Sequence, residues 1–257
     1  MEIGEYRNIY ENEETHFFYV GNHKIILSLI RKYFGGIPKN LKILDAGCGT
    51  GLLAKKLAKF GDVGAIDSSR EAVRFSKKRG VRVLLASVNK LPFKDNFFDL
   101  VVSVDVIYHK AVDDKGALGE FFRVLKPNGI LILRVPANSW LGTLHDEHVH
   151  TRERYSKGEL KNKLEDTDFI IEKLSFVNLS LAPLALARRL WEEVARPERS
   201  ASAIGNPPRL LNNLLSFLLF LEARFLAIGD LPLGIGLIAV CRKPGLGDEI
   251  PSSKKSR

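Results

Sequence analysis

Residues 43–51 read Ile43-Leu44-Asp45-Ala46-Gly47-Cys48-Gly49-Thr50-Gly51. The apolar start of this stretch predicts a short strand over residues 41–46, and the alternating glycines predict a tight loop that leads into a helix. In open α/β sheets a ligand binds beyond the carboxyl ends of the strands, where this loop lies. Glycines allow the backbone to approach such a ligand closely. The stretch therefore predicts a ligand site at the end of the first strand.

Strands and helices continue to alternate after this loop. Further strands are expected at residues 63–66, 81–86, 100–104, 130–135, 169–177 and 234–241. The run Leu100-Val101-Val102-Ser103-Val104 is apolar on both faces, as in a central strand of a parallel sheet. The pattern predicts an α/β fold, namely a doubly wound, mostly parallel, seven-stranded sheet with a helical insertion before the last strand.

The same patterning divides the chain into parts. We expect an N-terminal helical lid or cap at 1–40, a ligand-binding core at 41–182, a helical insertion at 183–232, the last core strand at 233–243 and a disordered tail at 244–257. A long apolar helix is expected at 209–228, but Asn212, Asn213, Glu222 and Arg224 interrupt it. Such residues are costly in a bilayer core, so it is not a spanning helix. Its excess of apolar residues leaves an apolar acceptor, a membrane surface or a partner subunit as alternatives.

Composition limits the class of protein. With 257 residues, 45% hydrophobic and 27% charged, the chain is typical of a folded globular protein. The net charge of +9 is spread along the chain, which disfavours nucleic acid as a partner. Only Cys48 and Cys241 are present, and the N-terminus lacks the basic and apolar regions of a secretory signal. These features predict a cytoplasmic protein.

The type of ligand follows from what surrounds the glycines. A dinucleotide fingerprint needs glycine at the position of Leu52, and a phosphate-binding P-loop needs Lys followed by Ser or Thr after Gly51. Asp67 ends the second strand, where a carboxylate can accept hydrogen bonds from both hydroxyls of a ribose. Acidic residues at Asp45 and Asp67 suit a ligand that has a cationic amino acid group, a ribose and no pyrophosphate. S-adenosylmethionine is such a ligand.

Two downstream motifs extend this pattern, Leu91-Pro92-Phe93 with Phe98-Asp99-Leu100-Val101-Val102-Ser103, and Arg123-Val124-Leu125-Lys126-Pro127-Asn128-Gly129. With them, the chain resembles the class I S-adenosylmethionine-dependent methyltransferases over about residues 41–136. The resemblance implies the Rossmann-like fold of that family and a transferase that converts S-adenosyl-L-methionine to S-adenosyl-L-homocysteine. Carried over, the cofactor-binding residues are Asp45, Gly47, Cys48, Gly49 and Gly51 at the methionine part, Asp67 with Ser68 at the ribose, Ser87 with Val88 at the adenine, and Val104 beside the methionine end. Ser87 departs from the Asp that is common there.

His109 is the candidate catalytic residue, because many family members have a histidine near the reacting methyl group. Its unperturbed pKa suits a general base. The alternative, which we favour, is that His109 only orients cofactor or acceptor, because alignment and desolvation supply most of the acceleration in such a displacement. The loop His145-Asp146-Glu147-His148-Val149-His150 matches no metal-binding spacing, so we predict no metal site there and expect a loop at the mouth of the active site.

The acceptor is expected to be a small or lipid-like molecule, because the helical insertion could cap a pocket. The alternatives are a non-catalytic protein that binds S-adenosylmethionine or S-adenosylhomocysteine, and an RNA or protein methyltransferase. Asp105-Val106-Ile107-Tyr108 stands where an Asn-Pro-Pro-Tyr type sequence would favour methylation of nucleobase amino groups. A homodimer through the C-terminal helices and an aromatic lid formed by His16-Phe17-Phe18-Tyr19 are further expectations.

Overall fold

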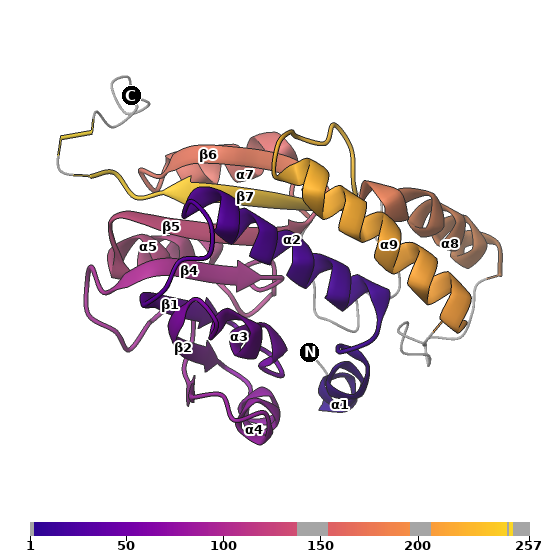
Figure 1. The fold of residues 1–257 in the computed structure, drawn as a ribbon, viewed down its shortest axis with the longest axis horizontal. Coiled ribbons are helices and arrows are strands. Elements are labelled where there is room, and N and C mark those ends of the chain that lie inside the picture. Colours follow the sequence, from indigo (N-terminus) through magenta and orange to yellow (C-terminus); the bar gives the residue numbers. More distant parts are fainter. Residues whose placement is uncertain (1–2, 138–153, 196–206, 246, 249–257) are drawn as a thin grey trace.

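The computed structural model describes residues 3–137, 154–195, 207–245 and 247–248. Its centre is a seven-stranded sheet with the strand order β3-β2-β1-β4-β5-β7-β6 (Figure 1). The strands are β1 Leu41–Ala46, β2 Gly61–Asp67, β3 Val83–Leu85, β4 Phe98–Val104, β5 Leu125–Pro136, β6 Ile170–Val177 and β7 Gly236–Arg242. Strands β1 to β5 pair in parallel, whereas β7 runs antiparallel between β5 and β6. The predicted doubly wound, mostly parallel sheet is confirmed.

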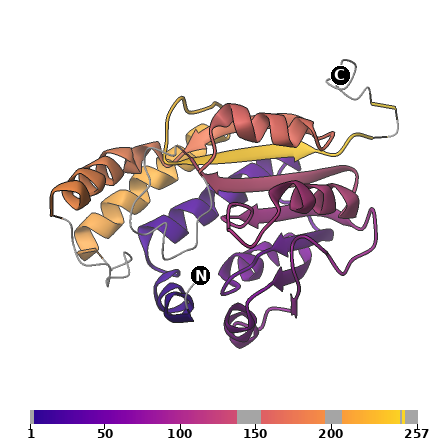
Figure 2. The ribbon, with the colours of Figure 1, turned by 180° about the vertical axis from the view of Figure 1, so that it is seen from behind.

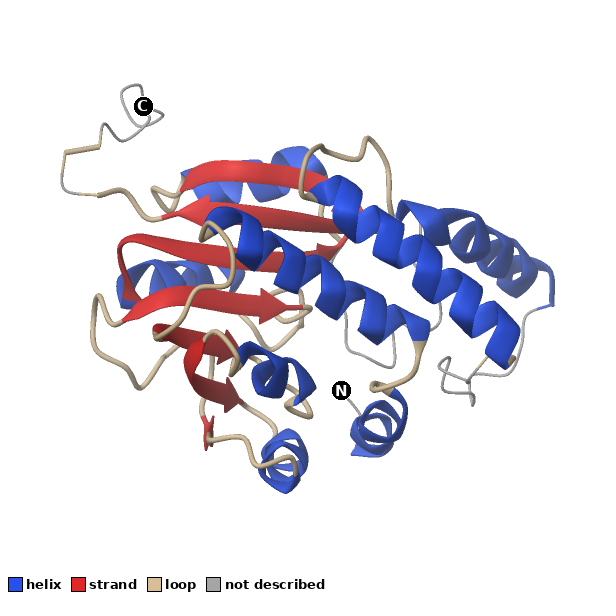
Figure 3. Ribbon diagram, in the orientation of Figure 1, coloured by secondary structure: helices blue, strands red, loops and turns tan. Residues whose placement is uncertain are grey.

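Helices cover both faces of this sheet (Figure 3). Helices α2 Phe17–Tyr33, α3 Leu52–Leu57 and α9 Arg209–Leu226 share one hydrophobic cluster with one face. Helices α5 Asp114–Val124 and α7 Lys157–Glu165 pack on the other face, seen in Figure 2. Helix α4 Arg70–Lys78 lies near β3 and contacts α1 Ile3–Asn12. After β6 the chain forms a short turn of 3₁₀ helix, Leu179–Leu181, then α8 Ala182–Ala195 and α9, before it returns as β7.

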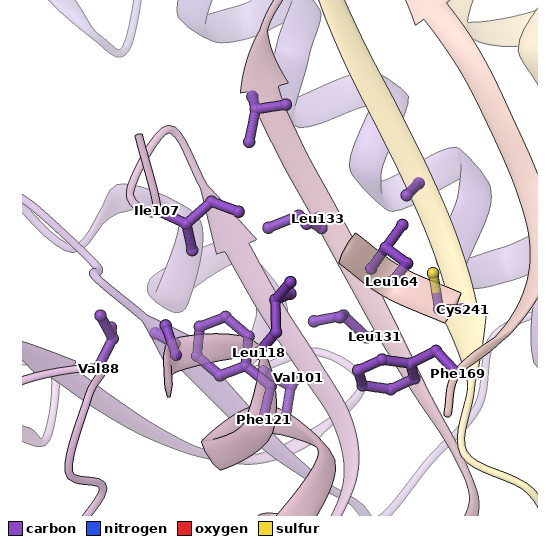
Figure 4. Close-up of a cluster of buried hydrophobic side chains, with 14 of the residues drawn as sticks. Val88, Val101, Ile107, Leu118, Phe121, Leu131, Leu133, Leu164, Phe169 and Cys241 are labelled. Carbon is purple, nitrogen blue, oxygen red and sulfur yellow. The ribbon is translucent and has the colours of Figure 1, made fainter. Parts of the chain in front are cut away.

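The core beneath α5 and α7 shows how the sequence pattern becomes packing (Figure 4). Val101 of β4 and Leu131 and Leu133 of β5 are fully buried together with Leu118 and Phe121 of α5. Burying one such side chain contributes roughly 1.5–3 kcal/mol to folding. The apolar runs predicted as central strands are therefore buried on both faces, and they fix the strand ends at which the glycine loop begins.

Local capping signals set where two of the helices begin. Ser156 caps α7, since its Oγ accepts a hydrogen bond from the Glu159 amide at 3.1 Å. The sequence Ser68-Ser69-Arg70-Glu71 predicts a capping box at the start of α4, and the cap is Ser69, whose Oγ accepts a hydrogen bond from the Ala72 amide at 3.4 Å. Both helices therefore begin where a side chain satisfies an amide that has no partner within the helix.

The N-terminal region differs from the sequence expectation. The sequence indicates one helix near residues 24–34, but the structure contains α1 and a longer α2 that begins at Phe17. Helix α1 has few apolar residues and depends on tertiary contacts, because Tyr6 is buried in a cluster with Phe75 of α4. His16 is the N-cap of α2, since its Nδ1 accepts from the Phe18 amide at 3.3 Å. Histidine is outside the usual set of capping residues, so the pattern did not reveal this start.

Three sequence expectations concern termini, loops and membranes. The loop His145–His150 lies outside the described residues, as does most of the tail at 244–257. No group of three or more metal-ligating side chains is found among the residues that the structure describes. Over the same residues, no helix combines the length and the hydropathy that crossing a bilayer requires.

Candidate functional site

The glycine loop, residues 47–51, leaves the carboxyl end of β1 and turns into α3. Gly47, Gly49 and Gly51 have φ angles of 86°, 54° and 85°, a left-handed region in which other residues are strained. A Cβ at Gly47 would lie 2.3 Å from a methyl carbon of Val106. Glycine is therefore required at Gly47 by both conformation and space, and the loop presents bare backbone at the end of the sheet.

Asp67, the last residue of β2, closes this loop from the side. Its Oδ2 accepts a hydrogen bond from the Gly49 amide at 2.9 Å, and its Oδ1 accepts one from the Ser69 amide, also at 2.9 Å. Burial raises the pKa of Asp67, while these backbone amides act in the opposite direction. A carboxylate has about four lone-pair positions, so Asp67 retains acceptor capacity for two ribose hydroxyls.

Asp45 has a buried carboxylate oxygen that no donor in the described part of the chain reaches. The residue is 2% exposed, and its Oδ2 has no hydrogen-bond partner among the described residues. Burial raises the pKa of Asp45 to about 7, and the negative charge of Asp67 adds to the shift. A buried carboxylate oxygen without a donor is costly. An ammonium group at this place would supply both the donor and the opposite charge, so the residues fit the amino acid end of S-adenosylmethionine.

The other predicted cofactor residues lie at neighbouring strand ends. Ser87 and Val88 follow β3, and Val104 ends β4 beside β1. The Ser87 Oγ accepts a hydrogen bond from the Asn89 amide at 3.2 Å, so it stabilises its own turn. The Cys48 thiol is buried 3.5 Å from the Ser76 Oγ, and burial raises its pKa. Ser87 and Cys48 therefore offer backbone rather than reactive side chains to a ligand.

His109 follows β4 in a turn. Its amide donates to the Val106 carbonyl at 3.2 Å, and its ring lies against Tyr108 with the ring centroids 4.5 Å apart. The side chain is half-buried. This arrangement suits a side chain of fixed orientation, and its catalytic role stays a prediction.

Helix α1 and Glu13, which directly follows it, form a wall of the site through contacts that the sequence did not indicate. The carboxylate of Glu13 accepts hydrogen bonds from the hydroxyl of Thr50 and from Arg79 Nη2, the latter at 2.8 Å. The Arg79 side chain is 5% exposed and also donates to the Tyr10 carbonyl at 2.9 Å. Burial raises the pKa of the Tyr6 hydroxyl, and the charge of Asp67 raises it further. Helix α1 is thus attached directly to the glycine loop through residues far apart in sequence, which no local pattern reveals.

A second polar network joins three strand ends to the helical insertion. Arg134 of β5 is 4% exposed, and it forms an ion pair with Asp105, which follows β4, through Nη1. Its Nη2 donates to Asn178 Oδ1 at 2.8 Å, directly after β6. The Asn178 amide donates to Glu222 of α9, whose other carboxylate oxygen accepts from the Ser180 hydroxyl at 3.0 Å. One buried arginine therefore connects the end of β4, beside the glycine loop, with α9.

Residues 44–133, which contain the glycine loop, Asp67 and β4, match a family described as a methyltransferase domain. The uncharacterized protein MJ1123 of Methanocaldococcus jannaschii is 30% identical over 169 residues, which cover 65% of this chain and 79% of that protein. This chain belongs to the class I S-adenosylmethionine-dependent methyltransferases.

Other relatives share only a segment with this chain. The sterol 24-C-methyltransferase erg6 of Aspergillus fumigatus is 34% identical over 105 residues, 37% of this chain and 28% of that protein. The tRNA (carboxymethyluridine(34)-5-O)-methyltransferase of Arabidopsis thaliana is 28% identical over 125 residues, 48% and 30% of the two chains. This chain thus spans less than a third of the length of either relative.

Solved structures show the same fold over most of the chain. The methyltransferase in complex with the Trm112 activator of Haloferax volcanii aligns over 96% of both chains with a TM-score of 0.60 and 18% identity. An S-adenosylmethionine-dependent methyltransferase from Methanosarcina mazei aligns over 85% of this chain and 98% of its own, with a TM-score of 0.57 and 19% identity. At these identities the likeness extends to the fold alone.

Replacing Asp67 with alanine removes the acceptor of the Gly49 amide and the predicted ribose contact. We expect S-adenosylmethionine to bind at least ~30-fold more weakly, a loss of about 2 kcal/mol, because hydrogen bonds to a charged group are lost. Titration calorimetry measures the change. Asp62→Ala is the matched control, since Asp62 is a half-exposed carboxylate at the other end of the same strand. Equal affinities of the two variants would contradict the assignment.

The raised pKa of Asp45 predicts a pH dependence of cofactor binding. In the free protein the carboxyl titrates at about 7, whereas a bound ammonium group requires the carboxylate. Binding then releases a proton, so affinity should fall by up to about tenfold per pH unit as the pH drops below 7. Calorimetry in buffers of different ionisation enthalpy checks this. An unchanged slope in Asp45→Asn would refute the role of Asp45.

The stability of the free protein should depend on pH in the opposite direction to its affinity for the cofactor. The folded chain holds the Asp45 proton more tightly than the unfolded chain does. The stabilising contribution of this proton is therefore present at low pH and is lost as the pH rises through about 7.

Arg134→Met should strongly destabilise the chain. It leaves Asp105 and Asn178 without their buried partner, which typically costs ~3–5 kcal/mol. Lys126→Met is the matched control, because Lys126 of β5 pairs with Asp99 of β4 at 2.7 Å at a partly exposed position, where such pairs contribute about 0–1 kcal/mol. Urea unfolding compares the two variants, and equal losses would show that the Arg134 network has no special weight.

Proposed function

We propose that this methyltransferase transfers the methyl group of S-adenosylmethionine to a small or lipid-like acceptor and releases S-adenosylhomocysteine. The observation that carries the proposal is the unpartnered, buried Oδ2 of Asp45, which lies beside the glycine loop and near Asp67. An ammonium group, a ribose and a sulfonium on one small ligand match these two carboxylates and the bare backbone between them. The helical insertion after β6 supports an acceptor site that is separate from the cofactor site.

Each part of the chain then has a role in binding or alignment. When bound, the cofactor supplies a methyl group on a positively charged sulfur, which an acceptor atom displaces in line. Asp45 binds the ammonium group, and Asp67 accepts hydrogen bonds from the ribose hydroxyls. Residues 1–40 act as the cap, in which Tyr6 and Glu13 of the N-terminal segment exclude water from the glycine loop. His109 orients the reactants or accepts the proton that the acceptor loses.

The relatives and the apolar helical insertion indicate the type of acceptor. Sterol methyltransferases are among the relatives that share the cofactor domain, and α8 of the insertion exposes Leu184, Leu186 and Trp191. A tRNA methyltransferase shares that domain as well, so RNA is the principal alternative. A lipid-like acceptor agrees better with the apolar insertion, because RNA-binding surfaces are rich in clustered positive charge.

A labelled-methyl assay tests this proposal. The full chain is incubated with methyl-labelled S-adenosylmethionine and, separately, with a lipid extract, a polar metabolite extract, tRNA and a protein extract. We expect label in the lipid or metabolite fraction, and at least ~30-fold less with Asp67→Ala at a subsaturating cofactor concentration, while Asp62→Ala should retain full activity.

Two results would overturn the proposal. Label found only in tRNA or in protein would show that the acceptor is not a small or lipid-like molecule, although the chain would still be a methyltransferase. Tight cofactor binding without transfer to any fraction would favour a protein that binds S-adenosylmethionine or S-adenosylhomocysteine without catalysis.

A further inference from the structure

Helix α9 is apolar on two opposite faces. Its inner face, which includes Leu215, Leu219 and Leu226, is buried, and α9 packs along α2 (Figure 1). Its outer face and the turn that follows it carry large apolar side chains that are exposed to solvent. These are Leu210 (85% exposed), Leu214 (53%), Phe217 (55%), Leu221 (46%), Phe225 (46%) and Ile228 (84%).

This outer face is unusual for a helix at the surface of a monomer. A surface helix normally places charged and polar residues opposite its buried stripe, and a helix that is apolar all round is normally buried. Along the outer stripe from 210 to 228 the only charged residue is Arg224, whose guanidinium lies over the Phe220 ring at 5.4 Å. The other charged residue within this part of α9, Glu222, faces inward and is 7% exposed. The sequence of α9 thus matches a helix that is covered on both sides.

The size of the face fits a protein interface. Each large, half-exposed side chain has an exposed area of about 100 Å², so the six residues together expose roughly 600 Å². The largest apolar patch on a typical monomer is about 300–600 Å², and a stable interface buries about 800 Å² on each partner. The face therefore reaches the upper limit for a monomer and, with neighbouring side chains such as Leu211, approaches what a stable dimer needs.

The spacing and charge of the face indicate the type of partner. The exposed residues recur at steps of three and four residues, the pattern with which one helix packs into the groove of another. A helix that lies on a lipid surface instead has a polar face rich in Lys and Arg, and the face of α9 opposite the stripe packs against α2. A two-fold axis requires only that a surface match itself. A stripe with six exposed apolar side chains and a single charge, Arg224 against the Phe220 ring, meets this condition, because apolar side chains make up nearly all of the surface that would meet its copy.

We propose that the outer face of α9 packs against α9 of a second copy of this chain across a two-fold axis. The proposal is independent of the acceptor and of methyl transfer, because the stripe contains none of the residues of the cofactor site.

Light scattering with size exclusion at micromolar concentrations tests the proposal on the full chain. The wild type should elute with twice the chain mass of 28.8 kDa. Leu221→Glu places a carboxylate in the middle of each stripe, so the dimer dissociation constant should rise at least ~100-fold, as two like charges are buried together. Leu84→Glu is the matched control, since Leu84 is 50% exposed on β3, and it should remain a dimer.

Cofactor affinity and far-ultraviolet circular dichroism show that the variants are folded, and both should be unchanged. A monomeric wild type, or a Leu221→Glu variant that dimerises as the wild type does, would overturn the proposal. So would a monomer that floats with vesicles of anionic phospholipid, because a membrane surface would then be what covers the stripe.

Discussion

Two backbone amides, those of Gly47 and Cys48, share the carbonyl oxygen of Ile66 at 2.9 Å each, and the cofactor side of the molecule depends on this contact. It joins the loop after β1 to the end of strand β2, so that Asp67, the next residue, reaches the Gly49 amide. The left-handed conformations of the loop glycines are what allow both amides to point at one oxygen. The loop is thus anchored to two paired strands, which suits a site that must align a methyl group with its acceptor.

The site contains more buried acidic side chains than basic ones. Asp45, Asp67 and Glu13 are all buried near the glycine loop. Among the described residues the ion pair with any of them is that of Arg79 with Glu13. Burial raises the pKa of all three carboxyl groups. Such an excess of buried acid is unfavourable for the free protein, yet it is complementary to a ligand that carries an ammonium and a sulfonium. Stability is reduced here in the way expected of a binding site.

The sequence predicted those features that are encoded locally. The strand pattern and the glycine loop follow from spacing within a few residues, and the sheet is as expected. The start of α7 is equally local, because Ser156 and Glu159 lie three residues apart in the spacing of a capping box. Helix α1 was missed because its stability comes from contacts with α4 and the glycine loop. The pairing of Arg134 with Asn178 was also missed, since it spans 44 residues and a buried arginine inside an apolar strand carries no motif.

Glu222 accepts hydrogen bonds from the Asn178 amide and the Ser180 hydroxyl, and these bonds connect α9 to the end of β6. Glu222 lies on the inner face of α9, and from it a continuous series of side chains leads through Asn178 and Arg134 to Asp105 at the end of β4. Displacing α9 would break that series, so the arrangement of β4 and the position of α9 are thermodynamically linked.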